Sequence, residues 1–565
     1  MRTPRIVRRA VPAPGAWPDE VHPVLRRVYA ARGVLSYAQA QPRLAGLLAP
    51  DTLGGIDAAS ARLARAVVED RRIVVVGDFD CDGATGVAVG VRGLRMLGAN
   101  QVAYQVPHRI LHGYGLTPAL VEAMEPLRPD LVVTVDNGIA CHAGIAAAKA
   151  RGWDVIVTDH HLPGASLPPA DAIVNPNVPG DLFPSKALAG VGVMFYLLLA
   201  TRRLLRESGR ANEADLSALL DLVAVGTVAD MVPLDANNRI LVAAGLRRLR
   251  EGRCQEGLRA LAAVAGRPLD RLVAGDIGYF IGPRINAAGR LEDMAIGIEC
   301  LLADDPAHAA ELAHSLDAIN RERRGVQEEM LEDAGRFAGL EADGDCAALC
   351  VHDAGWHPGV IGLVASKLKE RLHRPVVAFA PAAPGSAEWR GSARSIPGFH
   401  VRDALAEVDA AQPGLILRFG GHAMAAGLGV READIPAFSR AFEAVARARI
   451  APEWLDATVL TDGELGAEDA SLDLAQQLRW AGPWGQGFPE PVFDGEFAVA
   501  SWRVVGERHL KLQLERRGKR IDAIEFGGWT DEPPPPTVRI AYRLDVNEWR
   551  DTRSVQLVVV HRERA

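Results

Sequence analysis

Short, unbroken hydrophobic runs alternate with helical stretches between residues 72 and 175 of the chain. Runs of this kind, rich in β-branched residues and continuous rather than alternating, are typical of parallel strands covered by helices on both faces. The pattern therefore predicts an α/β domain. Its predicted strands are IVVV (73–76), QVAYQV (101–106), LVVTV (131–135) and DVIVT (154–158).

Helical patterns surround this region. The longest apolar run, residues 187–200, is shorter than the roughly 20 residues of a membrane-spanning helix, so we interpret it as a buried helix and expect no membrane association. Residues 213–265 are also helical in pattern and would cover the sheet. A long helix is predicted to begin at Asp305-Pro306, an N-cap followed by proline in the first turn.

One stripe of this long helix repeats at spacings of three and four residues and has an arginine in its middle. An amphipathic core helix explains the stripe. A connector between two domains explains it equally, and the arginine would then face a cleft. The stripe consists of Leu312, Leu316, Ile319, Arg323, Val326 and Met330.

A second α/β pattern and a β-rich region complete the chain. The second pattern has predicted strands at 347–352, 375–380 and 415–419. From about residue 458, short alternating strands separated by Gly, Pro and charged turns predict a small antiparallel barrel or sandwich. The predicted fold class is α/β with a C-terminal β-barrel module. The predicted segments are an N-terminal extension (1–50), a parallel-sheet α/β domain (51–300), a connecting helix (301–340), a second α/β domain (341–450) and a barrel of the OB type (451–565).

The composition is that of an ordinary globular protein. Hydrophobic residues make up 48% and charged residues 24% of the 565 residues, which excludes disorder for the bulk of the chain. The six cysteines stand at irregular positions and indicate no disulfide framework. The N-terminal arginines are not followed by an apolar stretch, so we expect no secretory signal and a cytoplasmic location.

The formal net charge of −8 argues against a surface that binds nucleic acid everywhere. The charge is unevenly distributed, however. Residues 501–565 contain 13 Lys and Arg against 10 Asp and Glu, a local charge of +3, while the rest of the chain carries −11. Contacts with nucleic acid are therefore expected in a lined groove or pocket.

Three aspartates follow the first predicted strand in the sequence GDFDCDG. If this loop is extended, its alternate residues Asp78, Asp80 and Asp82 share one face. Neighbouring carboxylates raise one another's pKa unless a cation lies among them, so the loop predicts a metal site. An EF-hand calcium loop begins in the same way, but it requires a helix before the loop and a glutamate at its twelfth position, which here is Val89.

Two further strands end in groups that bind metals. The third strand ends in Asp136, and the fourth ends in Asp159-His160-His161. The carboxyl ends of parallel strands meet at one crevice, to which a helical segment adds Asp230. Each residue alone has another explanation, as a helix N-cap or a core histidine, but their joint occurrence favours a metal site. Oxygen ligands with one or two imidazoles and no thiolate favour manganese or magnesium over structural zinc.

Four motifs follow one another in the order GDFDCDG, VDNG, TDHH and GTVADMVPL. They resemble the motifs of the DHH phosphoesterase superfamily, which is named for the triplet found here at 159–161. The segment GGHAMAAG (420–427) resembles the signature of the DHH-associated substrate domain. The length, the barrel-like C-terminal region and GPRINAAGR (282–290) are most similar to the bacterial single-strand DNA exonucleases of the superfamily. The resemblance covers nearly the whole chain.

The resemblance implies two divalent ions, Mn²⁺ or Mg²⁺, with Asp136 bridging them. Many small members of the superfamily have a histidine at the position of Val76, and Asp78 is expected to compensate for its absence. The other implied ligands are Asp80 for one ion, and Asp82, His160 and Asp230 for the other.

The same resemblance assigns catalytic roles to Asp136, Asp159, His160 and His161. Asp159 would orient an imidazole, and His161 would lie near the leaving oxygen or a phosphate. The implied reaction is hydrolysis of a phosphodiester bond.

Arg390, Ser392 and Arg394 stand two positions apart, which on a strand places two guanidinium groups and a hydroxyl on one face. Such a face suits phosphate contacts, and a solvated edge strand is the alternative. The resemblance implies that Ser392 and Arg394 form a pocket for the 5′ end together with Arg109 and Arg284.

The glycines of GGHAMAAG follow the strand predicted at 415–419 and are expected to open a helix. Gly420 and Gly421 would let the backbone approach a phosphate, to which His422 would donate. A plain glycine-rich turn explains the glycines but not the histidine between them and the alanines.

Aromatic residues are interspersed with the basic residues of the C-terminal region. Aromatic faces and cations that follow a backbone are what sequence-tolerant binding of single strands requires. The alternative is that these rings form the core of a small barrel. They are Trp502, Phe526, Trp529, Tyr542 and Trp549.

The expected function is a single-stranded-DNA-specific 5′-to-3′ exonuclease that acts in recombination and repair. A phosphodiesterase of short oligonucleotides or cyclic dinucleotides would share the catalytic core, but the roughly 115 residues after the substrate domain argue against it. A non-catalytic DNA-binding scaffold is a third hypothesis, which the complete set of candidate ligands disfavours. The expected partners are single-stranded DNA with a 5′ end, single-strand-binding protein and recombination helicases, and the chain is expected to be a monomer.

Overall fold

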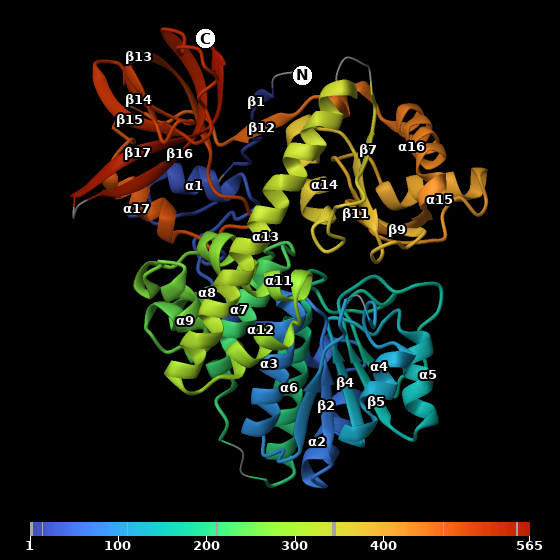
Figure 1. The fold of residues 1–565 in the computed structure, drawn as a ribbon. Helices are drawn as coiled ribbons and strands as arrows, with labels where there is room; N and C mark the ends of the chain where they lie inside the picture. Colours follow the sequence, from blue (N-terminus) through green and yellow to red (C-terminus); the bar gives the residue numbers. More distant parts are fainter. Residues whose placement is uncertain are drawn as a thin grey trace. The chain divides into compact units, whose positions relative to one another are not determined.

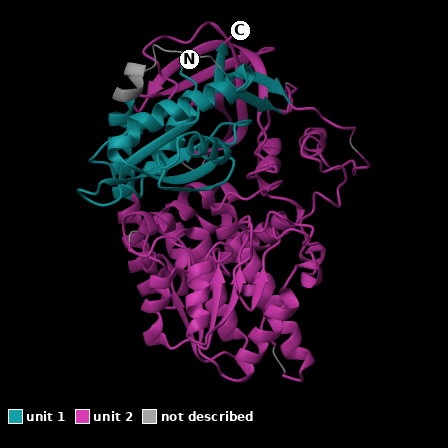
Figure 2. Cartoon of the chain, turned by 90° about the vertical axis from the view of Figure 1, so that its right-hand side faces the viewer, with its two compact units in different colours: residues 1–8, 321–461, 561–563 teal, residues 9–320, 462–560, 564–565 magenta. Residues whose placement is uncertain are grey.

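The computed structural model of the chain describes residues 4–13, 15–109, 111–210, 213–341, 346–466, 468–549 and 552–565. The chain divides into two compact units, shown in Figure 2. The larger unit comprises residues 9–320, 462–560 and 564–565, and the smaller one comprises residues 1–8, 321–461 and 561–563. Among the described residues, no helix combines the length and the apolar character needed to cross a bilayer.

The larger unit contains a five-stranded parallel sheet in the order β3-β2-β4-β5-β6, of which β2, β4 and β5 are labelled in Figure 1. The four strands predicted from the hydrophobic runs are confirmed, and β6 is an additional edge strand. Val76 pairs with Gln105 on one side and with Thr134 on the other, so neighbouring strands end close to the same level. The strands are β2 (Ile73–Val76), β3 (Val102–Gln105), β4 (Leu131–Val135), β5 (Asp154–Thr158) and β6 (Ala172–Val174).

Helices cover both faces of this sheet, as the continuous hydrophobic runs require. Val75 and Val133 belong to one core with residues of α2, α3 and α6, whereas Val74 and Val132 belong to another core with residues of α4 and α5. The apolar run at 187–200 forms the buried first half of α6, as predicted. The helices are α2 (Ile56–Val68), α3 (Cys81–Met96), α4 (Pro118–Ala123), α5 (His142–Ala150) and α6 (Gly190–Glu207).

A second layer of helices packs on α3 and α6 in the region that was predicted to be helical. Asp235 begins α8 as an N-cap, because its side chain accepts the backbone N–H of Asn238. The helices of this region are α7 (Leu220–Ala229), α8 (Ala236–Arg250) and α9 (Glu256–Val264), and the larger unit also contains α1 (Pro23–Ala30), α10 (Ala274–Asp276), α11 (Gly282–Leu291) and α12 (Ala295–Leu302).

The predicted long helix is confirmed as α13 (Pro306–Glu341). Asp305 caps it, because its carboxylate accepts the backbone N–H of His308 at 2.8 Å, and Pro306 takes the first helical position. The predicted stripe is buried in part. Leu316, Arg323 and Met330 are buried, whereas Leu312, Ile319 and Val326 are partly exposed.

The smaller unit contains a mixed five-stranded sheet in the order β10-β11-β9-β8-β7. Only β7 and β8 are parallel, and the other pairs are antiparallel. β9 lies in the middle, so the edge-strand interpretation of Arg390 to Arg394 is wrong. The elements are β7 (Leu349–His352), α14 (Ile361–Leu372), β8 (Val376–Pro381), β9 (Glu388–Arg394), α15 (Val401–Ala411), β10 (Arg418–Gly421), β11 (Ala425–Arg431) and α16 (Ile435–Arg449), with the parallel pair β1 (Arg5–Arg8) and β12 (Thr458–Thr461).

The structure corrects the prediction for GGHAMAAG. The strand begins at Arg418 rather than at residue 415, and the glycines do not open a helix. They end β10 in a tight hairpin to β11, where Gly421 has φ 138° and the backbone N–H of His422 donates to the carbonyl of Ala425 at 2.7 Å. Glycine favours this turn because it adopts positive φ without strain and contributes little to helix stability.

The C-terminal region forms a closed barrel in the order β13-β14-β15-β17-β16 (Figure 1). The predicted barrel is confirmed, with the difference that β15 and β17 pair in parallel. Alternate residues of β14 are buried, which is the pattern of a strand with one face in the core. The elements are α17 (Leu472–Trp480), β13 (Phe493–Val505), β14 (His509–Arg516), β15 (Lys519–Glu525), β16 (Thr537–Trp549) and β17 (Thr552–Arg564).

Candidate active site

The carboxyl ends of β2, β4 and β5 supply most of the candidate ligands. Asp78 follows β2, Asp136 follows β4, and Asp159 begins the triplet after β5. Asp136 has φ 61°, a conformation that a non-glycine residue adopts only when its surroundings hold it. The neighbouring Asn137 stabilises this conformation, because its side-chain amide donates to the carbonyls of Val76 and Val135.

The predicted extended loop of GDFDCDG is wrong, although its aspartates do gather at the site. α3 already begins at Cys81, so Asp80 is its N-cap and accepts the backbone N–H of Gly83 at 3.0 Å. Asp82 lies in the first turn of α3, where its carboxylate accepts the backbone N–H groups of Gly190 and Val191. Capping by Asp80 favours the turn into a helix over an extended loop.

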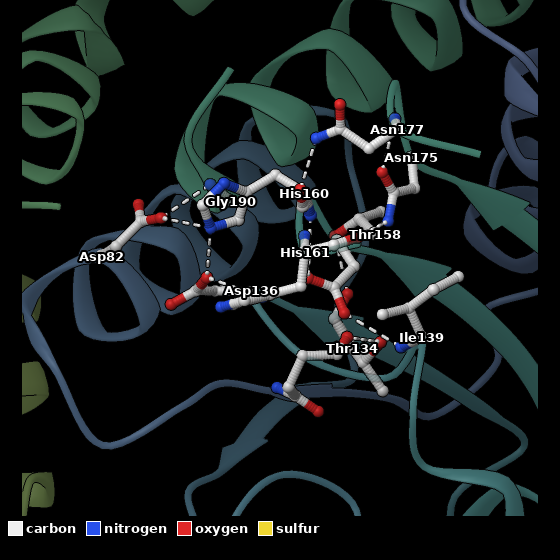
Figure 3. A network of polar contacts seen from close by, with 12 residues as sticks. Asp82, Thr134, Asp136, Ile139, Thr158, His160, His161, Asn175, Asn177 and Gly190 are labelled. Atoms are coloured by element: carbon white, nitrogen blue, oxygen red, sulfur yellow. Dashed lines mark hydrogen bonds and ion pairs between the residues drawn. The ribbon is translucent and has the colours of Figure 1, made fainter. Parts of the chain in front are cut away.

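The imidazole of His160 lies among three carboxylates, two of which appear with it in Figure 3. Its Nε2 atom is 3.0 Å from Asp136, 3.5 Å from Asp230 and 3.9 Å from Asp82. The candidate ligands of the described residues form three groups whose donor atoms lie within 4.8 Å of one another. These groups are Asp78, Asp80 and Asp136; Asp82, His160 and Asp230; and Asp136, His160 and His161.

Burial and mutual repulsion disfavour the charged form of these carboxyl groups. Burial, with the charge of Asp80, raises the pKa of Asp78 to about 8. Burial and the same neighbour raise the pKa of Asp230 to about 7. Burial and nearby carboxylates also raise the pKa of Asp82 and of Asp136 well above the usual range. A cation among them would remove this penalty.

The donor set fits divalent ions. It consists of carboxylate oxygens and imidazole nitrogens without a thiolate, which is the set that manganese and magnesium accept. One oxygen of Asp78, Oδ1, is buried without a hydrogen-bond partner among the described residues. A buried carboxylate oxygen in that state is costly unless a cation or water occupies its free valence.

Asp159 differs from the other carboxylates because its oxygens accept hydrogen bonds from several groups of the protein. It accepts the backbone N–H groups of Ile139, His160 and His161, and its Oδ1 lies 2.7 Å from Nδ1 of His161. Burial alone would raise its pKa, but the hydrogen bond and charge of His161 lower it. Burial alone would lower the pKa of His161, but Asp159 raises it to about 9.

Three family models match the chain in the order of its domains. They are the DHH family N-terminal domain at residues 72–227, the DHHA1 domain at 343–448 and the RecJ OB domain at 461–561. Relatives of high identity carry the name single-stranded-DNA-specific exonuclease RecJ. The protein from Dickeya dadantii is 49% identical and the one from Escherichia coli is 47% identical, each over 98% of this chain and 98% of the relative.

The chain belongs to the RecJ family. Solved structures of RecJ proteins agree with this assignment. The RecJ of Thermus thermophilus in complex with Mn²⁺ is 34% identical and aligns with a TM-score of 0.81, over 97% of this chain and 76% of that one. A structure of the same protein with Mg²⁺ aligns with a TM-score of 0.76, over 97% of this chain and 75% of that one, at 32% identity. Divalent metal binding is therefore a property of RecJ proteins with this fold.

Two of the predicted substrate residues, Arg109 and Arg284, lie in the larger unit, which also contains the candidate metal ligands. The guanidinium of Arg109 lies 3.8 Å from the centre of the Phe79 ring and donates to the carbonyl of Gly289. Arg284 is only 8% exposed, and its guanidinium is held by Asp317 at 2.8 Å and by the carbonyl of Phe280 at 2.6 Å. Arg284 therefore joins α11 to α13.

The other predicted substrate residues lie in the smaller unit. Arg390, Ser392 and Arg394 share one partly exposed face of β9, as their spacing predicted. Nη1 of Arg394 donates to Oγ of Ser392 at 2.9 Å, and burial lowers the pKa of Arg394. Gly420 and Gly421 end β10, and His422 begins the turn to β11.

The aromatic residues of the RecJ OB domain divide between core and surface. Tyr542 is buried in the barrel, whereas Trp502 is 40% and Phe526 is 64% exposed. The rings of Trp502 and Trp529 are stacked with their centres 5.5 Å apart. The side chain of Trp549 lies outside the described residues.

Sequence reasoning missed several residues that contact the site. Tyr114 lies edge-on to His161 and to Phe79, with ring centres 6.1 Å apart in each case. Asn286 accepts the backbone N–H of Cys81 at 2.9 Å. The signals were the motifs that contain them, since Tyr114 lies within PHRILHGYG (107–115), which also contains Arg109, and Asn286 lies within GPRINAAGR.

Proposed function

We propose that the chain is a metal-dependent exonuclease that degrades single-stranded DNA from its 5′ end, in recombination and repair. The observation that carries this proposal is the partly buried group of carboxylates and imidazoles around Asp136, in a chain 49% identical to a single-stranded-DNA-specific exonuclease. The cluster of candidate metal ligands supports hydrolysis of a phosphodiester bond, and membership of the RecJ family supports single-stranded DNA as the substrate. Single-strand-binding protein and recombination helicases are proposed as partners because they would act on the same single-stranded DNA, which is the substrate named for the relatives.

The proposed sites for two divalent ions, Mn²⁺ or Mg²⁺, rest on the resemblance to the DHH superfamily and are supported by two of the three groups of donor atoms. Asp136 would be shared between them. When bound, such ions supply an activated water and neutralise phosphate charge during an in-line displacement. The proposed ligands are Asp78, Asp80 and Asp136 for one ion, and Asp82, His160, Asp230 and Asp136 for the other.

Protein groups around the cluster have separate proposed roles. Asp159 orients His161 through the 2.7 Å contact between its Oδ1 and Nδ1 of the imidazole, and His161 is proposed to lie near the leaving oxygen or a phosphate. Asn137 fixes the backbone that presents Asp136. Precise placement of this kind is what a displacement reaction requires of the protein.

The 5′ end of the strand would be bound by arginines and small polar groups. Arg109 is proposed to contact it in the larger unit, and Ser392 and Arg394 in the smaller one, with His422 donating to a phosphate. The exposed Trp502 of the barrel suits stacking on a base. We expect Arg394→Ala to weaken the preference for 5′ ends more than it slows hydrolysis.

A phosphodiesterase of short oligonucleotides or cyclic dinucleotides is the alternative that shares the catalytic core. The closed barrel of β13 to β17 argues against it, because a dinucleotide does not need a separate strand-binding module.

The test is digestion of long single strands that carry a label at either the 5′ or the 3′ end. With Mn²⁺ we expect rapid early release of the 5′ label as mononucleotide and late release of the 3′ label. A substrate of two to five nucleotides serves as the comparison. Activity confined to that short substrate, or equal early release from both ends, would contradict the proposal.

A further inference from the structure

Helix α11, which carries GPRINAAGR, contacts the candidate active site through Asn286 and Gly289. Arg284 is engaged with Asp317. The side-chain oxygen of Asn286 instead accepts the backbone N–H of Cys81 at 2.9 Å. Cys81 is the first residue of α3, between Asp80 and Asp82, so Asn286 holds the turn that presents two candidate metal ligands.

Gly289 brings the same helix against the residue before this turn. A Cβ atom at position 289 would lie 1.9 Å from the backbone oxygen of Phe79, which is far shorter than a van der Waals contact, so any side chain there would clash. Glycine is thus required for α11 to approach Phe79. The carbonyl of Gly289 also accepts Nε–H of Arg109 at 2.8 Å.

The ring of Phe79 also holds the guanidinium of Arg109 in place. Phe79 is 9% exposed, and the guanidinium of Arg109 lies over its ring at 3.8 Å. The edge of the Tyr114 ring packs on Phe79 and fixes its orientation. Stacking on a ring and a hydrogen bond to a carbonyl restrict a guanidinium far more than either contact alone. Arg109 remains close enough to Asp78 to oppose the rise of its pKa.

We propose that Phe79, Asn286 and Gly289 are positioning residues that hold Arg109 beside the metal-binding carboxylates, so that one helix sets both the ligand turn and the recognition of a terminal 5′-phosphate. The inference deepens the proposed function and rests on its assignment of Arg109 to the 5′ end. It accounts for the GPRINAAGR motif, whose Arg284 is occupied elsewhere.

A double-mutant cycle tests the coupling between Phe79 and Arg109. Phe79→Leu removes the ring at similar volume, and Arg109→Lys keeps the charge but removes the planar group. Affinity is measured with Mn²⁺ by fluorescence anisotropy, on phosphorothioate oligonucleotides with a 5′-phosphate or a 5′-hydroxyl, and kcat and KM are measured on the normal strands. Phe183→Leu, which removes a buried ring that packs on Tyr196 in the same unit, is the matched control.

Each single variant is expected to lose about fivefold to tenfold of the preference for the phosphorylated end, as a higher KM at nearly unchanged kcat. The double variant should lose no more than either single one, Phe79→Tyr should retain the preference, and Phe183→Leu should leave it unchanged. Single effects that multiply in the double variant, or full preference in Phe79→Leu, would overturn the inference.

Asn286→Ala provides a second test that leaves the Phe79 ring in place. We expect a higher Mn²⁺ concentration for half-maximal activity together with a reduced preference for the phosphorylated end, and no change in either quantity would contradict the shared support. Failure of the proposed function itself would appear differently, as a lack of metal-dependent hydrolysis of single strands by the unaltered chain.

Discussion

Asp136 contributes to two of the three groups of candidate ligands, and its carboxylate lies 3.0 Å from His160, which belongs to the third. Its backbone is held at positive φ by the amide of Asn137, and its own N–H donates to the carbonyl of Thr158. Strain of this kind is stored where a side chain must point in one direction. A carboxylate in this place could be shared by the two proposed ions.

Replacement of this carboxylate gives the sharpest test at the residue scale. We expect Asp136→Ala to lower kcat for Mn²⁺-dependent hydrolysis by at least about a thousandfold, because both proposed ion sites lose a ligand. Binding of a single strand should remain measurable by anisotropy, since the proposed strand contacts lie on other residues. Asp270→Asn, at an exposed position outside the site, is the control. Retained turnover in Asp136→Ala would remove the shared-ligand assignment.

At the scale of elements, the hydrophobic pattern predicted the strands well. β2, β4 and β5 are buried on both faces, and their continuous runs of Val, Ile and Leu are the pattern that predicts such strands. The barrel strands were also visible in their alternation. The pattern failed where a tight turn decides the structure, because the hairpin at Gly421 depends on one positive φ and on pairing with a strand that follows it.

The candidate site was predictable as a set of residue types and not as a geometry. The three strand ends and Asp230 were found because parallel strands end at one edge. The contact of Arg284 with Asp317 could not be predicted, because the two residues lie 33 positions apart on different helices. Asn286 was missed for the same reason, since its contact with Cys81 joins positions 205 residues apart.

The start of β2 is tied to the start of β4 by an ion pair that gives a pH dependence. Arg72 donates to both oxygens of Asp130, at 2.9 and 2.6 Å. The hydrogen bond from Arg72 is the main cause that lowers the pKa of Asp130 to about 2. A lowered carboxyl pKa contributes stability that is present above the usual pKa of about 4 and is lost as pH falls toward 2.

We expect Asp130→Asn to lower the melting temperature by about 1–3 °C at pH 7, because the pair is accessible to solvent and contributes below about 1 kcal/mol. The difference from the unaltered chain should stay constant down to about pH 5 and shrink below that. Scanning fluorimetry at a series of pH values measures it. A difference that grows on acidification would contradict this account of the pair.

At the scale of the whole molecule, the net charge of −8 is compatible with a nucleic-acid substrate. Five of the acids that contribute to it lie at the proposed ion sites, and two divalent ions would reduce −8 to −4. The barrel strands carry a local excess of basic residues. Binding is therefore expected to depend on a limited number of phosphate contacts, with a correspondingly modest loss of affinity as salt is raised.

The same buried acids predict that metal ions stabilise the fold of the larger unit. Asp78, Asp82, Asp136 and Asp230 repel one another in a buried site, and this repulsion is relieved when a divalent ion binds the folded state. Saturating Mn²⁺ at pH 7.5 should raise the melting temperature by a few degrees, since a ligand at a hundred times its Kd adds about 2.7 kcal/mol. EDTA should reverse the shift, NaCl of equal ionic strength should not reproduce it, and Asp136→Ala should lose most of it. Equal melting temperatures with EDTA and with Mn²⁺ would show that the carboxylates bind no ion in the folded chain.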